Sequence, residues 1–457
     1  MYLYAIFRHT PMSSYAFVKA RPPIKPLSAY SNLLPIFPPL ESALPNPLPD
    51  PPQPRPFADP RFRVSTHIVP ACFLHTSAPP STPPPPAPST DASKDDRRRA
   101  MQARWEWVKA QDTPSGRYER VLMSVVNRYV AVDEQRREGG KTLFLAHANG
   151  FPKETWEPTI LELLAASGSD DIGEIWAWEA THHGASSVLN RQCGAPITGV
   201  GWSEDARDIV NFLLNFLPSE IAPPDALPLL LPRIAPTESA LRRVRGYNQR
   251  TLHAVGHSFG GCCSTWAALI VPRVFASLTL VDPVIIAYSN PSSPVGQPTL
   301  AEGALARRDT WPSREAALAS FKANRFFASW DPRVLDAYVA HGIVPDATGT
   351  GTGVCLAMPP LQESLVFNAT YMSGTVWDLV RTLDPRIPIR YVVPGLPGAP
   401  EIGGPGTTQE RVWLRPENSS NVRILTAGHL IVQEAPKELA KEIAAMVSGQ
   451  VNPQARL

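Results

Sequence analysis

The chain has 457 residues, with 43 lysine and arginine side chains against 41 aspartates and glutamates. This balance leaves no charge excess for nucleic acid or an anionic membrane, so neither is expected as a partner. No uncharged apolar run of about 18 residues occurs, which argues against a transmembrane span. The five cysteines are scattered without a C-x-x-C pair, a pattern that favours a reducing compartment and argues against zinc. We expect no metal and no cofactor.

Proline is concentrated in the first 100 residues, in stretches such as PPLESALPNPLPDPPQPRP and PPSTPPPPAPST. Such segments bury too little apolar surface to form a packed core. We therefore interpret residues 1–60 as a disordered extension and 61–457 as one domain. Within that domain, 61–75 (RFRVSTHIVPACFLH) is a candidate first strand and about 78–115 a surface insertion.

From about residue 120 the chain alternates strand-like and helix-like segments. This alternation predicts the α/β class, with a mostly parallel central sheet flanked by helices. The expected strands lie within 120–132, 141–148, 174–180, 251–258, 277–283, 387–395 and 421–429.

Two helices are marked by apolar residues at helical spacing. The first spans 203–217, with Ser203 as its N-cap, and the second is the last helix of the chain, at 435–447. Residues 218–246 interrupt the alternation and are interpreted as an extra surface loop. The apolar stripes face the core in this interpretation: Ile209, Phe212, Leu213 and Phe216 in the first helix, and Leu439, Ile443, Met446 and Val447 in the last.

The motif VGHSFGG follows the apolar strand candidate at 251–258 directly. G-x-S-x-G between a strand and a helix is the form of a nucleophile elbow, a turn so tight that its serine has strained backbone geometry. Gly256 and Gly260 stand where a Cβ atom would collide with neighbouring main chain. Ser258 is therefore the candidate nucleophile, and the N–H of Phe259 is free to face an oxyanion. The alternative is a glycine-rich turn with a buried serine.

A serine nucleophile needs a histidine base, and in hydrolases built on this elbow the chain order is serine, acid, histidine. Only His341 and His429 follow Ser258. His429 lies after the last strand candidate and before the last helix, as that order requires, whereas His341 stands in a helical segment. His429 is the predicted base.

The acid follows one of two strand candidates. Asp282 directly ends the strand at 277–283, whereas the strand at 387–395 has no carboxylate nearer than Glu401. We assign Asp282, which would hold the His429 imidazole in the tautomer that accepts the serine proton. A capping aspartate ahead of Pro283 is the alternative.

The second oxyanion donor should come from the loop after the strand at 141–148, where the sequence reads HANGFPKETWEP. The backbone N–H of Asn149 is the first choice, with Gly150 and Phe151 as alternatives.

In chain order, the motifs HANGFPKETWEP, GHSFGG, LVDP, DTWPSREAA, WDPRVLDAY and AGHL resemble those of the fungal peroxisomal α/β-hydrolases, a family with lipase, toxin-biosynthesis and acyl-CoA hydrolase members. The resemblance covers about residues 115–447 and implies an α/β-hydrolase fold. It also implies that the acid is the aspartate after the strand that follows the elbow, in agreement with Asp282. The proline-rich N-terminus and the 218–246 segment depart from the family pattern.

Substrate choice should depend on a helical cap inserted after the strand that ends at Asp282, at about 286–375. Ser313 and the pair Asp331-Pro332 are helix-start signals there, and Gly342 is a stop signal. The aromatic residues form the cap core or an acyl pocket, and the arginines form a solvated face or meet the phosphates of coenzyme A. These sets are Trp311, Phe321, Phe326, Phe327, Trp330 and Tyr338, and Arg307, Arg308, Arg314 and Arg325.

Together these features predict a serine hydrolase that cleaves an ester or thioester of a hydrophobic acyl group, with an acyl ester or acyl-CoA as its partner. The alternatives are an acyltransferase on the same fold and a non-catalytic ligand-binding protein of that fold. An acyl-CoA panel beside nitrophenyl esters separates them.

The last three residues of the tail at 448–457, Ala455, Arg456 and Leu457, are a variant of the S-K-L address that the peroxisomal import receptor reads. The peroxisomal matrix is therefore the expected location. The basic, acid-poor N-terminus makes the mitochondrion an alternative, although its prolines interrupt the helix that a presequence needs. The cytoplasm is the remaining alternative.

Overall fold

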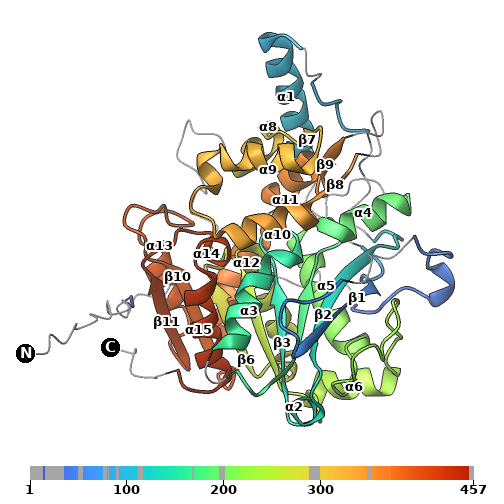
Figure 1. The fold of residues 1–457 in the computed structure, drawn as a ribbon, viewed down its shortest axis with the longest axis vertical. Helices are drawn as coiled ribbons and strands as arrows, with labels where there is room; N and C mark the ends of the chain where they lie inside the picture. The colour runs from blue at the N-terminus through green and yellow to red at the C-terminus, as the bar shows by residue number, and fades with distance from the viewer. Residues whose placement is uncertain are drawn as a thin grey trace, which may run out of the picture.

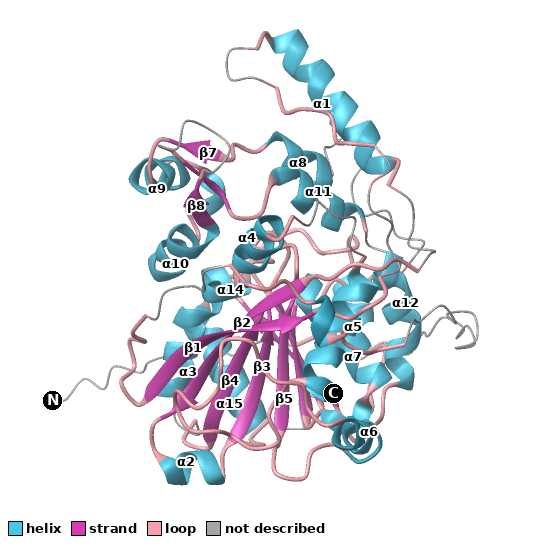
Figure 2. Cartoon of the chain, turned by 90° about the vertical axis from the view of Figure 1, so that its right-hand side faces the viewer, coloured by secondary structure: helices cyan, strands magenta, loops and turns pink. Residues whose placement is uncertain are grey.

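The computed structural model describes residues 14–15, 35–49, 55–75, 80, 82–88, 92–111, 117–166, 169–194, 201–287, 299–346, 353–369 and 371–451. Eight strands form one sheet in the order β1-β2-β4-β3-β5-β6-β10-β11, in which β2 is antiparallel to both neighbours and the other pairs are parallel. Figure 2 shows β1 to β5 of this sheet. All eight expected strands are present. They are β1 (Phe62–Pro70), β2 (Met123–Ala131), β3 (Lys141–Ala146), β4 (Ile172–Trp178), β5 (Leu252–His257), β6 (Ser277–Val281), β10 (Ile389–Pro394) and β11 (Ser419–Ile424).

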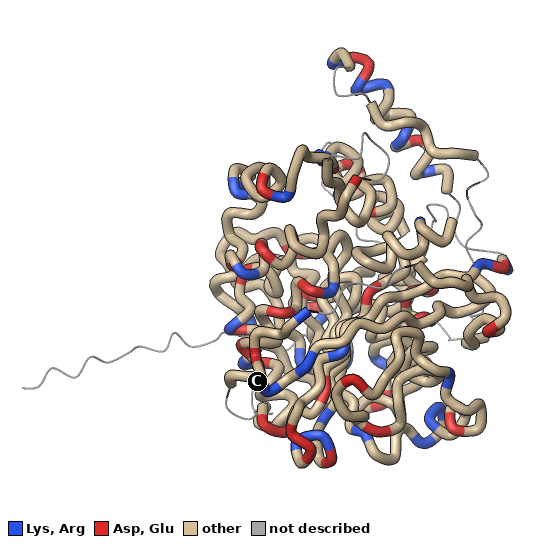
Figure 3. Tube along the Cα trace, turned by 45° about the vertical axis from the view of Figure 1, so that its right-hand side comes forward, with Lys and Arg blue, Asp and Glu red and all other residues tan. Residues whose placement is uncertain are grey.

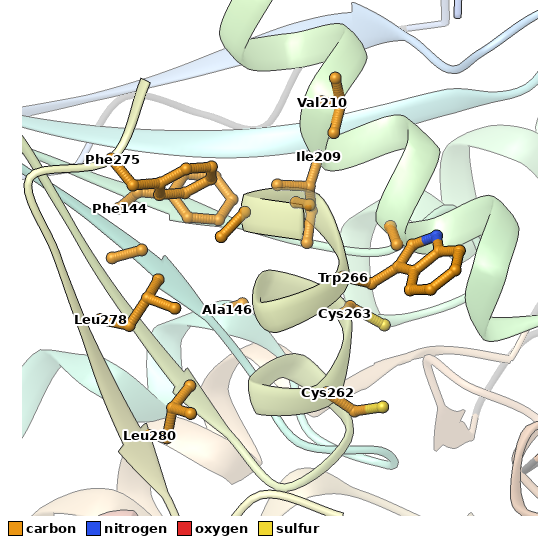
Figure 4. Packing of buried hydrophobic residues seen from close by; sticks show 14 of the residues in the cluster. Phe144, Ala146, Ile209, Val210, Cys262, Cys263, Trp266, Phe275, Leu278 and Leu280 are labelled. Carbon is orange, nitrogen blue, oxygen red and sulfur yellow. The ribbon is translucent and has the colours of Figure 1, made fainter. Parts of the chain in front are cut away.

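Helices cover both faces of the sheet (Figure 1). Because side chains alternate along a strand, Phe144 and Ala146 of β3 enter one apolar cluster while Leu143 and Leu145 enter the other. The first cluster, part of which Figure 4 shows, packs under α5 (Trp202–Asn215), α7 (Phe259–Ile270) and α12 (Tyr371–Leu379). The second packs under α3 (Glu157–Ala165) and α15 (Pro436–Val447).

The two helices expected from apolar spacing are α5 and α15, and the residues assigned to their apolar stripes are buried. The predicted N-cap of α5 is wrong. Gly201 is the N-cap, and Ser203 lies inside the helix. The helix starts earlier because Trp202 is anchored in the core, where its indole N–H donates to the Val366 carbonyl at 2.8 Å.

The extra segment at 218–246 is a loop only in its first part, because Pro236–Arg245 form the helix α6. Arg242 of this helix is buried, and its guanidinium donates to the Leu217 carbonyl at 2.7 Å. The short helices α2 (Glu134–Glu138), α4 (Gly184–Gln192), α13 (Thr407–Val412) and α14 (Ile431–Glu434) lie in other connections.

A cap lies beyond the carboxyl ends of the parallel strands (Figure 2). Its predicted helix starts are confirmed: the side chains of Ser313 and Asp331 cap α9 and α10, and α10 ends at Gly342. Met372, Val376 and Trp377 of α12 pack in the main core. The cap elements are α8 (Leu300–Ala306), β7 (Thr310–Trp311), α9 (Arg314–Lys322), α10 (Pro332–Gly342), β8 (Ile343–Pro345), β9 (Val354–Leu356) and α11 (Pro360–Asn368).

The surface insertion expected at about 78–115 contains the helix α1 (Lys94–Lys109). Trp107 and Val108, near its end, share an apolar cluster with Leu305, Leu361 and Leu365 of the cap. The other end of α1 projects from the molecule (Figure 1).

Parts of the segment 1–60, expected to be disordered, contact the domain. Phe57 lies edge-on to Tyr129 with ring centres 5.0 Å apart, and Arg55 pairs with Glu157. The expected disorder does not describe these residues, because each finds an apolar or charged partner on the sheet and on α3. Acidic and basic residues are mixed over the described trace (Figure 3).

Candidate active site

Ser258 occupies a strained turn between β5 and α7. Its φ is 55° and its ψ is −116°, a region that residues with a side chain rarely adopt. The turn is held because the Ser258 N–H donates to the Val281 carbonyl of β6 at 2.9 Å. The strain projects the hydroxyl beyond the end of the sheet, as a nucleophile elbow requires.

The two elbow glycines stand at close contacts between main-chain segments. A Cβ atom at Gly260 would lie 2.4 Å from the carbonyl oxygen of His147 and 2.5 Å from that of Ala146. At Gly256 it would lie 2.6 Å from the Gly260 carbonyl oxygen. The first turn of α7 therefore lies directly against the end of β3, next to the loop that carries Asn149.

The structure brings Ser258, His429 and Asp282 together in one hydrogen-bonded series. His429 Nε2 lies 3.0 Å from Ser258 Oγ, and His429 Nδ1 lies 2.7 Å from Asp282 Oδ2. Ser258 and Asp282 are buried, whereas the His429 side chain is 25% exposed. This is the geometry in which an ionised carboxylate would hold Nδ1 protonated and leave Nε2 free to accept a serine proton.

The alternative acid, Glu401, is placed elsewhere. Its Oε2 accepts from the N–H of Thr408 at 2.9 Å and its Oε1 from that of Gly406 at 3.2 Å. These N–H groups belong to the first turn of α13, where a carboxylate is favoured by the helix dipole. Glu401 therefore stabilises the start of a helix.

Arg411, a residue that the sequence did not indicate, contacts the candidate acid Asp282. Its Nη2 lies 2.5 Å from Asp282 Oδ1, and the side chain is fully buried. Burial acts to raise the pKa of Asp282, but the charge of Arg411 and the hydrogen bond from His429 outweigh it and hold that pKa below its ordinary value. No local pattern marks Arg411, which is 129 residues from Asp282.

His257, also unforeseen, holds the loop that carries the candidate base His429. Its Nε2–H donates to the carbonyl oxygen of His429 at 2.9 Å. Burial, with the nearby His429, lowers the pKa of His257 to about 3, so the ring is neutral near pH 7. Because His257 immediately precedes Ser258, the same turn positions Ser258 and the loop of His429.

Of the three N–H groups proposed as oxyanion donors in the loop after β3, two already have an acceptor within the protein. Gly150 donates to His183 Nε2 at 2.9 Å and Phe151 donates to the Ala148 carbonyl at 3.3 Å. Within the described part of the chain, the N–H of Asn149 has no acceptor. Phe259, as the first residue of α7, has no intrahelical acceptor either. Asn149 and Phe259 therefore stay the candidate oxyanion donors, as a prediction from the sequence.

A buried cluster of three charged side chains follows this loop. It includes Lys153 and Glu154, the last two residues of the motif HANGFPKE. Lys153 Nζ lies 3.0 Å from Glu154 Oε1 and 3.3 Å from Glu179 Oε2. Burial raises the pKa of Glu179 to about 6. For Glu154 burial also acts to raise the pKa, but the charge and hydrogen bond of Lys153, together with the charges of His341 and Arg55, outweigh it and lower the pKa to about 2.

The cap aromatics form a core that reaches the oxyanion loop. The Phe151 ring lies 5.5 Å from Trp330 and 6.0 Å from Tyr338. Four of the cap aromatics are buried in the same cluster with Tyr338, whereas Phe326 is 53% exposed. A small cavity between cap and loop is lined by Gly150, Pro152, Gly184, Arg307, Tyr338, Gly342, Leu356, Ala357 and Met358.

Three of the cap arginines are engaged inside the cap. Arg307 contacts Glu363 and donates to the Tyr338 hydroxyl at 2.6 Å. Arg308 and Arg314 donate to main-chain carbonyls within the cap. The geometry therefore favours a structural role for these three over a phosphate site.

Within the described ranges, no group of three or more histidine, cysteine, aspartate or glutamate side chains is arranged to hold a metal ion. In the same ranges, no helix combines the length and the apolar character needed to span a bilayer.

The sequence profile of the alpha/beta hydrolase family matches residues 143–442. The chain belongs to this family, and its sheet, elbow and cap are those of an α/β-hydrolase fold. Hydrolase is therefore the class of protein that the fold and the family define.

Among curated proteins, the type I acyl-CoA thioesterase mpaH of Penicillium roqueforti is 32% identical over 243 residues, which cover 49% of this chain and 48% of the relative. The abhydrolase domain-containing protein AFT2-1 of Alternaria alternata is 35% identical over 98 residues, 21% of this chain and 36% of the relative. The chain thus spans about half or less of the length of these curated relatives.

Among solved structures, the peroxisomal alpha-beta-hydrolase Lpx1 of Saccharomyces cerevisiae superposes with a TM-score of 0.58 at 18% identity, covering 86% of this chain and 90% of that chain. This likeness supports the shared fold.

Proposed function

We propose that this protein is a serine hydrolase that cleaves a thioester or ester of a hydrophobic acyl group through Ser258, His429 and Asp282. The supporting observation is the hydrogen-bonded series from Ser258 Oγ through the His429 ring to Asp282 at a strained elbow. The preference for a thioester rests on the acyl-CoA thioesterase among the relatives.

In the proposed reaction, Ser258 Oγ attacks the acyl carbonyl carbon while its proton passes to His429 Nε2. The N–H groups of Phe259 and Asn149 donate to the negative oxygen of the tetrahedral intermediate. The proton then moves from His429 to the departing thiolate or alkoxide, which leaves an acyl ester on Ser258. Water attacks this ester and gives a proton to His429. The proton returns to Ser258 as the carboxylic acid is released.

The test is hydrolysis of a panel of acyl-CoAs and nitrophenyl esters by the full chain and by Ser258→Ala. We expect turnover and labelling by a fluorophosphonate probe in the parent, and loss of both in the variant with an unchanged circular dichroism spectrum. Undiminished labelling of the variant would remove Ser258 from the mechanism. Acyl transfer to an added alcohol or amine, faster than release to water, would identify a transferase instead.

The peroxisomal location remains a prediction from the sequence, because Ala455, Arg456 and Leu457 lie outside the described residues. A fluorescent protein that ends in the last ten residues should coincide with a peroxisomal marker and return to the cytosol when Leu457 is deleted. Mitochondrial localisation of the full chain with this tail masked would contradict the prediction.

A further inference from the structure

The connection from β10 to α13 sets the position of α13, and a buried residue of that helix, Arg411, contacts the candidate acid Asp282. Between them the backbone turns through Gly403, Gly404 and Gly406, whose φ values are 89°, 94° and 83°, and Glu401 holds the first turn of α13. Arg411 follows in the last turn, fully buried. The turn and its cap thus fix the position from which Arg411 reaches Asp282.

The two oxygens of Asp282 are divided between two donors from different elements. Oδ1 contacts Arg411 Nη2, and Oδ2 contacts His429 Nδ1. A carboxylate held at one oxygen by a guanidinium has its plane and its second oxygen fixed. The arrangement therefore orients the oxygen that receives the histidine N–H.

The positive charge of Arg411 also favours the ionised form of Asp282. Asp282 is buried, and burial alone favours the neutral carboxylic acid, which does not stabilise an imidazolium. Arginine remains protonated in proteins, so Arg411 supplies a permanent positive charge beside Oδ1. That charge offsets the cost of keeping Asp282 ionised where water is excluded.

We propose that Arg411 is a positioning residue of the hydrolytic site, which holds Asp282 ionised and oriented toward His429 and so sets the lower pH limit of activity. This inference rests on the proposed function of Ser258, His429 and Asp282.

Other charged or titratable groups lie near the pair, and within the described residues no other side chain has a hydrogen bond or ion pair to Oδ1. The buried, neutral His257 ring of β5 donates to the His429 carbonyl, and the Glu434 carboxylate of α14 accepts from the Gly428 N–H at 2.6 Å. Glu401 lies on the turn before α13, and Tyr15 lies on the N-terminal segment.

The sign of the pH effect follows from the removed charge. Without Arg411, the coupled pair of Asp282 and His429 carries one positive charge less in its surroundings, so it binds a proton at higher pH. A proton on the pair, on either residue, leaves His429 unable to accept the serine proton. The acidic limb of the kcat/KM profile should therefore move upward.

The experiment measures kcat/KM against pH with a nitrophenyl ester, and in parallel the rate of fluorophosphonate labelling, for the parent chain and three variants. In Arg411→Met the acidic limb should rise by about one pH unit. Arg411→Gln removes the charge but keeps a donor and should show the same rise, which serves as a second test if the methionine variant folds poorly. Arg411→Lys keeps the charge, and its limb should stay near that of the parent.

Arg415→Met is the matched control, because Arg415 is equally buried in the next turn of chain but donates to main-chain carbonyls, at 2.6 Å for Ile387. It should lower stability without moving the acidic limb. An unmoved limb in Arg411→Met and Arg411→Gln, or an equal rise in Arg415→Met, would overturn the inference. If Ser258→Ala retains labelling, the proposed function fails. If that variant is inactive while the Arg411 variants leave the limb in place, only this inference fails.

Discussion

Replacement of Gly260 by alanine should push the first turn of α7 away from the end of β3 and the loop that follows it. In Gly260→Ala the new Cβ atom would lie 2.4 Å from the His147 carbonyl oxygen and 2.5 Å from the Ala146 carbonyl oxygen. Both atoms belong to the main chain at the end of β3 and cannot rotate away. Restoring van der Waals contact requires the two segments to part by about 1 Å.

The expected magnitude follows from two opposing effects. Alanine gains about 1 kcal/mol over glycine in a helix, whereas overpacking in a rigid site costs about 1–3 kcal/mol and sometimes more. With two main-chain overlaps below 3 Å at Gly260, overpacking should prevail and lower the free energy of unfolding by about 2 kcal/mol. The same displacement moves the Phe259 N–H away from that of Asn149. Loss of an oxyanion donor lowers kcat by about 10²–10³.

The matched control is Gly303→Ala in α8, where nothing lies within 4 Å of the added Cβ. It should stabilise the chain by up to about 1 kcal/mol and leave kcat unchanged. Urea unfolding gives the free energies, and nitrophenyl ester hydrolysis gives kcat. Equal stability and equal kcat in the two variants would refute the close approach of α7 to β3.

Three further predictions concern carboxylates. Asp282→Asn should lower kcat by about 10⁴, while Glu401→Gln affects mainly stability; a large loss of kcat only in Glu401→Gln would transfer the role of acid. Glu154→Gln should lower the thermal midpoint more than Glu179→Gln, because the ionised form is favoured at Glu154 and disfavoured at Glu179; the reverse order in calorimetry would contradict this. The folded-state pKa of Asp282 is below the ordinary 3.8, so its ionisation stabilises the fold above about pH 4 and that contribution is lost as pH falls. The stability gap between parent and Asp282→Asn in urea should therefore narrow below pH 4, and a widening gap would be inconsistent with the lowered pKa.

Much of the fold follows from local sequence patterns. Apolar strand segments alternate with helical stripes, and this alternation alone indicates a parallel sheet covered by helices. The glycines around Ser258 are equally local, because the elbow places each of them within two residues of the serine. The order of serine, aspartate and histidine then selects His429 from ten histidines.

The sequence also left local choices unresolved. Ser203 satisfies the N-cap preference, yet the N-cap lies two residues earlier, at Gly201, because Trp202 is held by the Val366 carbonyl. Asn149 is preferred over Gly150 and Phe151 from the motif alone. The structure adds that His183, 33 residues away in the chain, accepts the Gly150 N–H, which favours Asn149 as the candidate donor.

What the sequence determined by itself is the strands of the central sheet, the strand-turn-helix motif around Ser258 and the chain order of Ser258, Asp282 and His429, because each of these signals is local. Only the tertiary structure decided which groups surround them. Arg411 reaches Asp282 across 129 residues, and His257 holds the carbonyl of His429 across 172. Such contacts depend on which strands are neighbours in the sheet and on which buried carboxylate lies within reach of a buried arginine. These two conditions leave no periodic pattern in the sequence, because the side chains come together only when the ends of the strands meet in the folded protein.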